Sequence, residues 1–199
     1  MTENTKENKT SQSQVKGFRV LDLAYMALFA ALMAICSWIT IPSGIPFTLQ
    51  TFGVFMAVAL LGGKRGTLSI SLYVFMGIIG LPVFSGFKAG IGHLLGMTGG
   101  YIWGFIVSAL VMWAMMNIKP KNKMVANIYK IFTMLVGLFV CYALGTIQFM
   151  NLYLQKNGAG SATLAMCLGW CVIPYILPDC IKIALAFILS ERLKRYIPE

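Results

Sequence analysis

Long apolar runs separated by short polar or basic stretches make up most of the chain. Six such runs follow a polar segment at residues 1–17: Val20–Ile41, Phe47–Leu61, Thr67–Leu81, Tyr101–Ile118, Ile128–Leu154 and Ala162–Ser190. A helix of about 20 apolar residues can cross a bilayer, and the second and third runs, at about 15 residues, are short for that purpose. The pattern predicts an all-α integral membrane protein with six transmembrane helices.

Composition and charge support a membrane protein and fix its expected orientation. Hydrophobic residues make up 58% of the chain and charged residues 11%, with a net charge of +10. The cations lie between the apolar runs, which argues against nucleic-acid binding; eleven lie at one set of helix ends and two, Lys88 and Lys156, at the other. By the positive-inside rule, both termini are cytoplasmic and the protein lies in the plasma membrane. We expect a disordered tail at residues 1–17 and one membrane domain at 18–199.

Two connections between the runs are unusual. Gly62–Gly66 joins the two short runs, either as a turn between two crossings or as the tip of a re-entrant hairpin; the first is favoured because it keeps Lys64 and Arg65 out of the membrane. Leu81–Tyr101 is rich in glycine, too apolar for an ordinary solvated loop and not expected to be helical. Irregular backbone at membrane depth is tolerated where it lines a cavity, so we expect this outer loop to cover a pocket.

The last apolar run carries two opposite charges. Asp179 and Lys182 are three residues apart, so they share a helix face in a segment where charges are costly. Pro174 and Pro178 are expected to interrupt the helix, with a new helix beginning at Pro178 and Asp179 in its first turn. Three roles stay open for the pair: a structural ion pair, a ligand site in which Asp179 accepts and Lys182 donates, or a proton-carrying Asp179.

Other polar or small residues are weaker candidates. Thr48, Gln50 and Thr51 either point into the same pocket or cap a helix. The single histidine, His93, is either a ligand contact or a structural residue, and Tyr101 either an interfacial anchor or a pocket wall. The sequence has no P-loop and no recognisable catalytic or metal-binding motif, so neither an enzyme nor a resident cofactor is expected.

Four motifs, in this order, resemble the BioY family, the biotin-binding S components of energy-coupling factor (ECF) transporters: Pro46–Thr51, Gly80–Phe84, Gly96–Tyr101 and Leu177–Lys182. The resemblance runs from about Leu21 to Arg192. The chain departs from the family at Met97, where proline is common, and at His93, where another residue is usual.

The resemblance implies a six-helix bundle that captures biotin at the outer face and delivers it across the membrane with a partner module. Asp179 and Lys182 correspond to the family's biotin contacts, and the quoted motifs add Phe84 and Gly99 to the predicted binding set, beside Thr48, Gln50, His93 and Tyr101. Ala27 and Ala31 correspond to the face that docks the transmembrane coupling subunit, and two partner ATPases use the ATP. The alternative is a stand-alone, proton-coupled small-molecule transporter.

Overall fold

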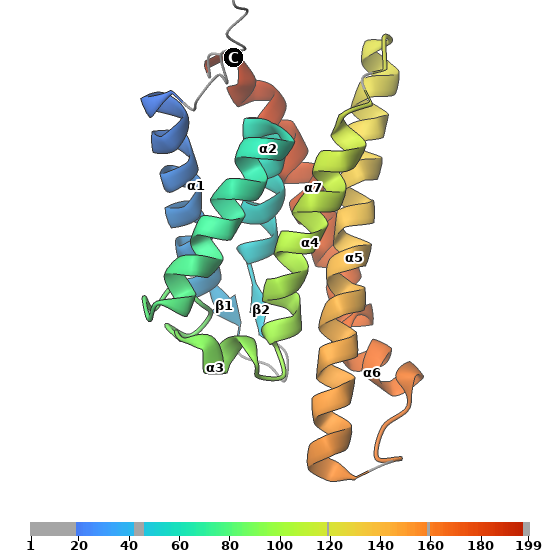
Figure 1. Ribbon diagram of the computed structural model, residues 1–199. Coiled ribbons are helices and arrows are strands. Elements are labelled where there is room, and N and C mark those ends of the chain that lie inside the picture. The colour runs from blue at the N-terminus through green and yellow to red at the C-terminus, as the bar shows by residue number, and fades with distance from the viewer. Residues whose placement is uncertain (1–18, 42–45, 119, 159, 197–199) are drawn as a thin grey trace, which may run out of the picture.

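A computed structural model describes residues 19–41, 46–118, 120–158 and 160–196, so the predicted tail lies outside it. Seven α-helices and a short 3-10 helix form a bundle over these ranges (Figure 1): α1 (Val20–Trp38), α2 (Gln50–Ile78), α3 (Ile91–Leu94), α4 (Gly99–Met116), α5 (Lys123–Asn157), α6 (Leu164–Cys171), α7 (Ile173–Leu193) and η1 (Lys194–Tyr196). Two short antiparallel strands, β1 (Thr40–Ile41) and β2 (Phe47–Thr48), connect α1 to α2.

Four helices, α1, α4, α5 and α7, are long and apolar enough to span a membrane. The helix α2 is a hairpin of two shorter segments, because Gly62 at its middle has φ 81° and ψ 169°. The two segments lie side by side: the Gln50 amide, near the start of α2, donates to the Tyr73 hydroxyl, near its end, at 2.7 Å. The tight turn between two short helices is confirmed, whereas six crossings and cytoplasmic termini stay predictions.

Glycines let neighbouring backbones meet closely at the α2 corner. A Cβ atom on Gly63 would lie 2.5 Å from the Trp113 side chain of α4, and one on Gly66 would lie 2.7 Å from the Val58 backbone. The corner is also tied to α1, because Arg65 forms an ion pair of 3.2 Å with the buried Asp22. These contacts make the corner a fixed joint between α1, α2 and α4.

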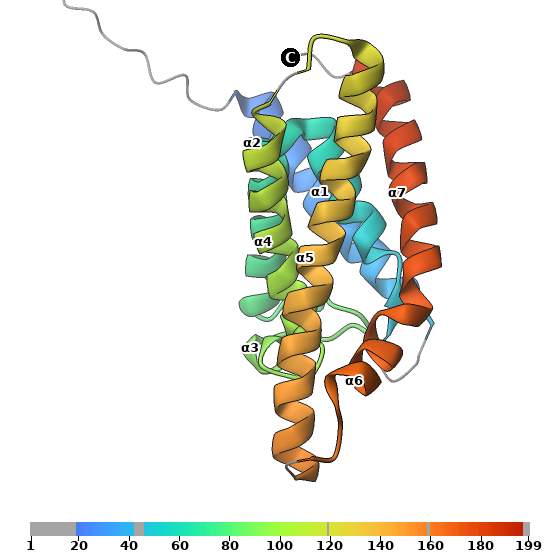
Figure 2. The ribbon, with the colours of Figure 1, turned by 90° about the vertical axis from the view of Figure 1, so that its right-hand side faces the viewer.

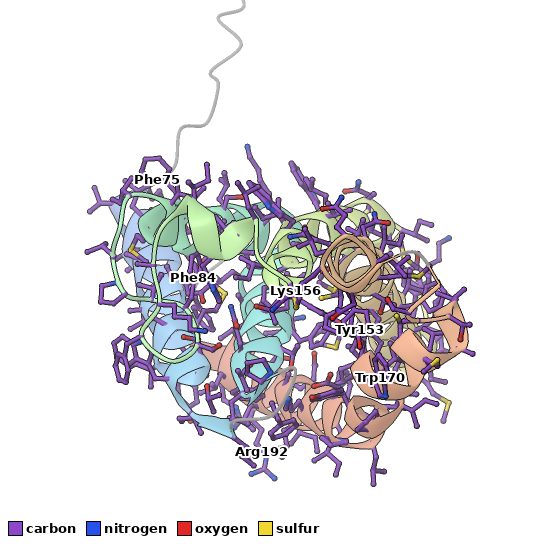
Figure 3. The ribbon with its side chains drawn as sticks, turned by 90° about the horizontal axis from the view of Figure 1, so that it is seen from below. Phe75, Phe84, Tyr153, Lys156, Trp170 and Arg192 are labelled. Atoms are coloured by element: carbon purple, nitrogen blue, oxygen red, sulfur yellow. The ribbon has the colours of Figure 1, made fainter. Side chains whose placement is uncertain are left out.

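The bundle has two ends that differ in structure (Figures 1 and 2). At the end we call the pocket end lie the β1–β2 hairpin, α3 and α6; at the other, the far end, lie the α2 corner, the start of α1 and the end of α7. A large apolar core, which includes Met33, Phe55 and Met112, fills the bundle. A smaller cluster joins α5 to α6, where the rings of Tyr153 and Trp170 lie 5.6 Å apart (Figure 3).

Two predicted segments, the last apolar run and the glycine-rich loop, differ from the structure. The run Ala162–Ser190 is two helices, α6 and α7, which meet at Val172. The expected break at Pro178 is wrong: Pro174 lies in the first turn of α7, where proline needs no hydrogen-bond partner, and Pro178 lies inside the helix. The glycine-rich segment is a loop that contains one helical turn, α3, and its last residues already belong to α4.

Candidate functional site

A pocket opens among β2, α2, α4, α5, α7 and the glycine-rich loop. It encloses about 660 Å³ of empty space, part of it open to solvent. Six of the predicted binding residues line it: Thr48, Gln50, His93, Tyr101, Asp179 and Lys182. Segments that are far apart in the sequence therefore meet at one concave site, which is the usual form of a small-molecule site.

Lys182 uses all the donors of its ammonium group within the protein. Its Nζ atom lies 2.7 Å from Asp179 Oδ1, 2.6 Å from the Thr48 carbonyl oxygen and 3.2 Å from Thr51 Oγ1. It also lies 4.1 Å from the centre of the Phe47 ring, a cation–π contact. Because an ammonium has three N–H donors, no donor of Lys182 remains for a ligand in this arrangement.

Asp179, by contrast, keeps an unused acceptor. Its Oδ1 accepts from Lys182 and, at 2.9 Å, from the Thr51 hydroxyl, while Oδ2 accepts, among the residues that the structure describes, only from the Tyr142 hydroxyl, at 2.5 Å. A carboxylate offers about four acceptor positions, so one stays open on Oδ2. We call Asp179, Lys182, Thr51 and Tyr142 the floor cluster. The two charges of the cluster are paired, and its open acceptor position on Asp179 Oδ2 suits a ligand that donates a hydrogen bond.

The position of Asp179 comes from helix geometry rather than from a helix start. Asp179 and Lys182 are separated by three residues within α7, so one turn brings both onto the buried face. The helix begins at Ile173, and Asp179 therefore lies beyond its first turn. The predicted position of Asp179 in the first turn of a helix is wrong. The charge is balanced instead by Lys182 and by two hydroxyl donors.

Aromatic side chains form much of the remaining wall. Phe47 of β2 and Tyr175 of α7 stack at 6.3 Å between ring centres, and Tyr101 and Phe105 line the pocket from α4. Sequence reasoning missed Phe47, Tyr142, Tyr175 and Phe105, because an aromatic residue within an apolar run looks the same whether it packs or lines a cavity. The position of Tyr175, one helical turn before Asp179, was the one available signal.

Two predicted binding residues do not line the pocket. Phe84 is fully buried behind it (Figure 3), between the Tyr73 ring, 5.8 Å away, and the His93 ring, 5.4 Å away. Gly99 is buried at the start of α4, where a Cβ atom would overlap the Leu94 carbonyl group. Both residues support the pocket without facing it. Phe84 fills the space beneath the loop, and Gly99 allows α3 to pack on α4.

Gln50 connects the pocket to the base of the glycine-rich loop. Its amide donates to the Tyr73 hydroxyl, which donates in turn to the Val83 carbonyl oxygen at 3.0 Å. The Ser37 hydroxyl of α1 reaches the same carbonyl at 2.5 Å. The loop is therefore anchored to both α1 and α2 by hydrogen bonds that are buried beside the site.

The alanines of α1 divide between two faces. Ala30 and Ala34 are buried against the bundle, while Ala27 and Ala31 are exposed on the outside of the helix. Small exposed residues at a spacing of four allow another helix to approach closely. The structure thus places the two predicted docking residues on an open surface.

The fold and the pocket together define a class of protein: a multi-pass membrane protein with a small-molecule-sized pocket between its helices. Comparison with known proteins identifies the family. Residues 6–199 match the BioY family, and the chain belongs to that family.

Two curated relatives and one solved structure illustrate the similarity. The chain is 37% identical over 169 residues to the biotin transporter BioY of Thermotoga maritima. The aligned region covers 84% of this chain and 92% of that protein. The chain is 37% identical over 174 residues to a probable biotin transporter BioY of Pyrococcus horikoshii, covering 87% and 96%. A crystal structure of the S-component for biotin from an ECF-type ABC transporter superposes with a TM-score of 0.74 at 28% identity, covering 88% and 92%. These relatives are named as transporters, not enzymes.

Proposed function

We propose that this chain is the biotin-binding S component of an ECF-type transporter. It captures biotin at the outer face of the plasma membrane and passes it across with a partner coupling module. The observation that carries the proposal is the floor cluster: a buried side chain, Asp179, pairs with Lys182 and keeps one acceptor position open in a pocket with aromatic walls. The membership of the chain in the BioY family supports biotin as the ligand.

The chemistry of biotin fits this pocket. The ureido ring carries N–H donors, and the open position on Asp179 Oδ2 accepts one of them as a charge-assisted hydrogen bond. The apolar bicycle lies against Phe47, Tyr101 and Tyr175. Lys182 acts as a positioning residue, because its three donors hold Asp179, Thr48 and Thr51 in place.

Direct binding tests the proposal. The purified chain, alone in detergent or lipid nanodiscs, is titrated with biotin by calorimetry. We expect saturable binding with one biotin per chain and no chemical change in the recovered ligand. Absence of binding by correctly folded protein would overturn the proposal.

The partner module is the second part of the proposal. We infer that Ala27 and Ala31 on α1 dock a transmembrane coupling subunit, which carries two ATPases, because they form an exposed small-residue face. Ala27→Leu should leave biotin binding intact and prevent co-purification with the coupling module. Ala184→Leu, which enlarges an exposed alanine on α7, is the matched control and should assemble normally. Normal assembly of the Ala27 variant would remove α1 as the docking face.

The rival is a stand-alone, proton-coupled transporter in which Asp179 carries the proton. The pairing of Asp179 with Lys182 and two hydroxyl groups argues against it, because protonation would leave a buried ammonium without its counter-charge. Liposomes that contain this chain alone distinguish the two. The S-component proposal predicts no concentrative uptake, whereas uptake that a protonophore abolishes would favour the rival.

A further inference from the structure

His93 is fixed at the side of the pocket formed by the glycine-rich loop. It lies on the single turn α3, lines the pocket and packs against Phe84, with the two rings tilted by 31°. Phe84 cannot shift easily, because it is fully buried against Tyr73 and against Gly77, where even a Cβ atom would overlap its ring. The imidazole therefore rests on a rigid aromatic support.

The backbone around His93 is also held in place. The Gln148 amide of α5 donates to the carbonyl oxygens of Leu94 at 2.9 Å and Gly96 at 2.8 Å. At the other side of α3, the Gly90 N–H group donates to the Gly77 carbonyl oxygen at 2.7 Å. These bonds position the turn relative to α2 and α5. The histidine is thus presented to the pocket by a supported backbone.

The ring nitrogens of His93 have no hydrogen-bond partner among the residues that the structure describes, although the ring is only half-buried. Burial lowers the pKa of His93, and the positive charge of Lys88 lowers this pKa further. A neutral imidazole offers one donor and one acceptor. The floor cluster differs, since the donors of Lys182, Thr51 and Tyr142 are already in use there.

We propose that His93 receives the carboxylate tail of biotin and takes up a proton from solvent as biotin binds. The inference rests on the proposed function. A carboxylate at the floor would meet the Asp179 carboxylate and find the donors of Lys182, Thr51 and Tyr142 already in use, so the tail is directed to a polar group elsewhere on the pocket wall. There it meets a donor, and its negative charge favours the imidazolium form. Ligand and proton binding are consequently linked at one residue.

The charged and titratable groups around His93 are consistent with this linkage. Lys88, in the same loop, is the cation whose field acts on it. From α2 the neighbouring ionisable group is Tyr73, and from α4 it is Tyr101, both neutral phenols near pH 7. Asp179 and Lys182 of α7 neutralise each other. The carboxylate of the ligand is therefore the charge that shifts the protonation of His93.

The test compares biotin with biotin amide, whose tail is neutral and of nearly the same shape. Calorimetry between about pH 6 and pH 8, in buffers of different ionisation enthalpy, gives affinity and protons bound. The wild-type chain should prefer biotin by roughly tenfold, more at the lower pH, with net proton uptake for biotin and none for the amide. The variant His93→Phe keeps an aromatic ring beside Phe84, and its affinities for biotin and biotin amide should be nearly equal. The variant His93→Gln should retain part of the preference for biotin.

Lys88→Gln is the control, because Lys88 is exposed and does not line the pocket. The Lys88→Gln variant should keep the preference for biotin over biotin amide. If this variant lost the preference while His93→Phe retained it, the tail would be assigned to Lys88 and the proposal overturned. If neither His93 variant folds, the proton count of the wild-type chain decides, since zero uptake contradicts the proposal. Failure of the wild-type chain to bind either ligand would instead refute the proposed function.

Discussion

Two polar clusters join α5 to α7, one at each end of the bundle, and they differ in what they leave free. At the pocket end, Tyr142 of α5 donates to Asp179 of α7. At the far end, Lys130 of α5 lies 2.7 Å from Glu191 Oε1 and 2.9 Å from Ser190 Oγ. The far cluster is a partly exposed ion pair with the Glu191 side chain 34% accessible, whereas the Asp179 and Lys182 side chains are 5% and 6% accessible.

The difference separates a binding site from a structural tie. The far cluster does not line this pocket and includes a second cation, Lys194, 3.7 Å from Glu191, so its carboxylate is already shared. The floor cluster borders a cavity and retains an acceptor. A buried charge pair is expensive to desolvate, so its retention beside a cavity favours a role in binding.

The largest effect is expected for Asp179→Asn. The substitution removes the charge-assisted bond to the ligand and leaves Lys182 without its counter-ion, so biotin affinity should fall by about 2 kcal/mol or more, roughly 30-fold. Calorimetric titration of the purified variant measures the loss. Cys180→Ala, at the adjacent exposed position of α7, is the control and should bind normally. Unchanged affinity in the Asp179 variant would make the floor cluster a structural tie like its counterpart.

A smaller effect is expected for Tyr142→Phe. The ring stays, but Asp179 Oδ2 loses the hydroxyl that orients it, so affinity should fall by about 1 kcal/mol, roughly fivefold. The same titration gives the value, and a thermal unfolding curve shows whether the bundle is intact. Tighter binding would mean that Tyr142 competes with the ligand for Asp179 instead of positioning it.

The smallest effect is expected for Glu191→Gln at the far end. Biotin affinity should stay within about twofold of the wild-type value, and stability should fall by at most about 1 kcal/mol, as for other partly exposed ion pairs. Binding and thermal unfolding are measured on the same sample. A tenfold loss of affinity would show that the two clusters act together, and the distinction between them would then be wrong.

The sequence predicted the parts of the site that carry charge or glycine, because these residues stand out in an apolar chain. Asp179 and Lys182 were found from their spacing, and the corner at Gly62 from its composition. The interruption expected at Pro174 lies two residues earlier, at Val172, with Pro174 in the first turn of the new helix, while the second break expected at Pro178 is wrong because Pro178 lies inside α7. Tyr142 could not be distinguished from a packing residue, because its role depends on a partner 37 positions away.

The corner of α2 also decides how the protein can be handled. Gly62 turns the chain without any intervening loop, and the neighbouring glycines contact Trp113 and Val58 too closely for even a methyl group. A tag, a fluorophore or a protease site introduced there would separate the two halves of the hairpin. Exposed Lys121 and Lys123, before and at the start of α5, belong to a connection with room around it. Labels for single-molecule or cross-linking work should therefore be placed between α4 and α5, and the α2 corner left intact.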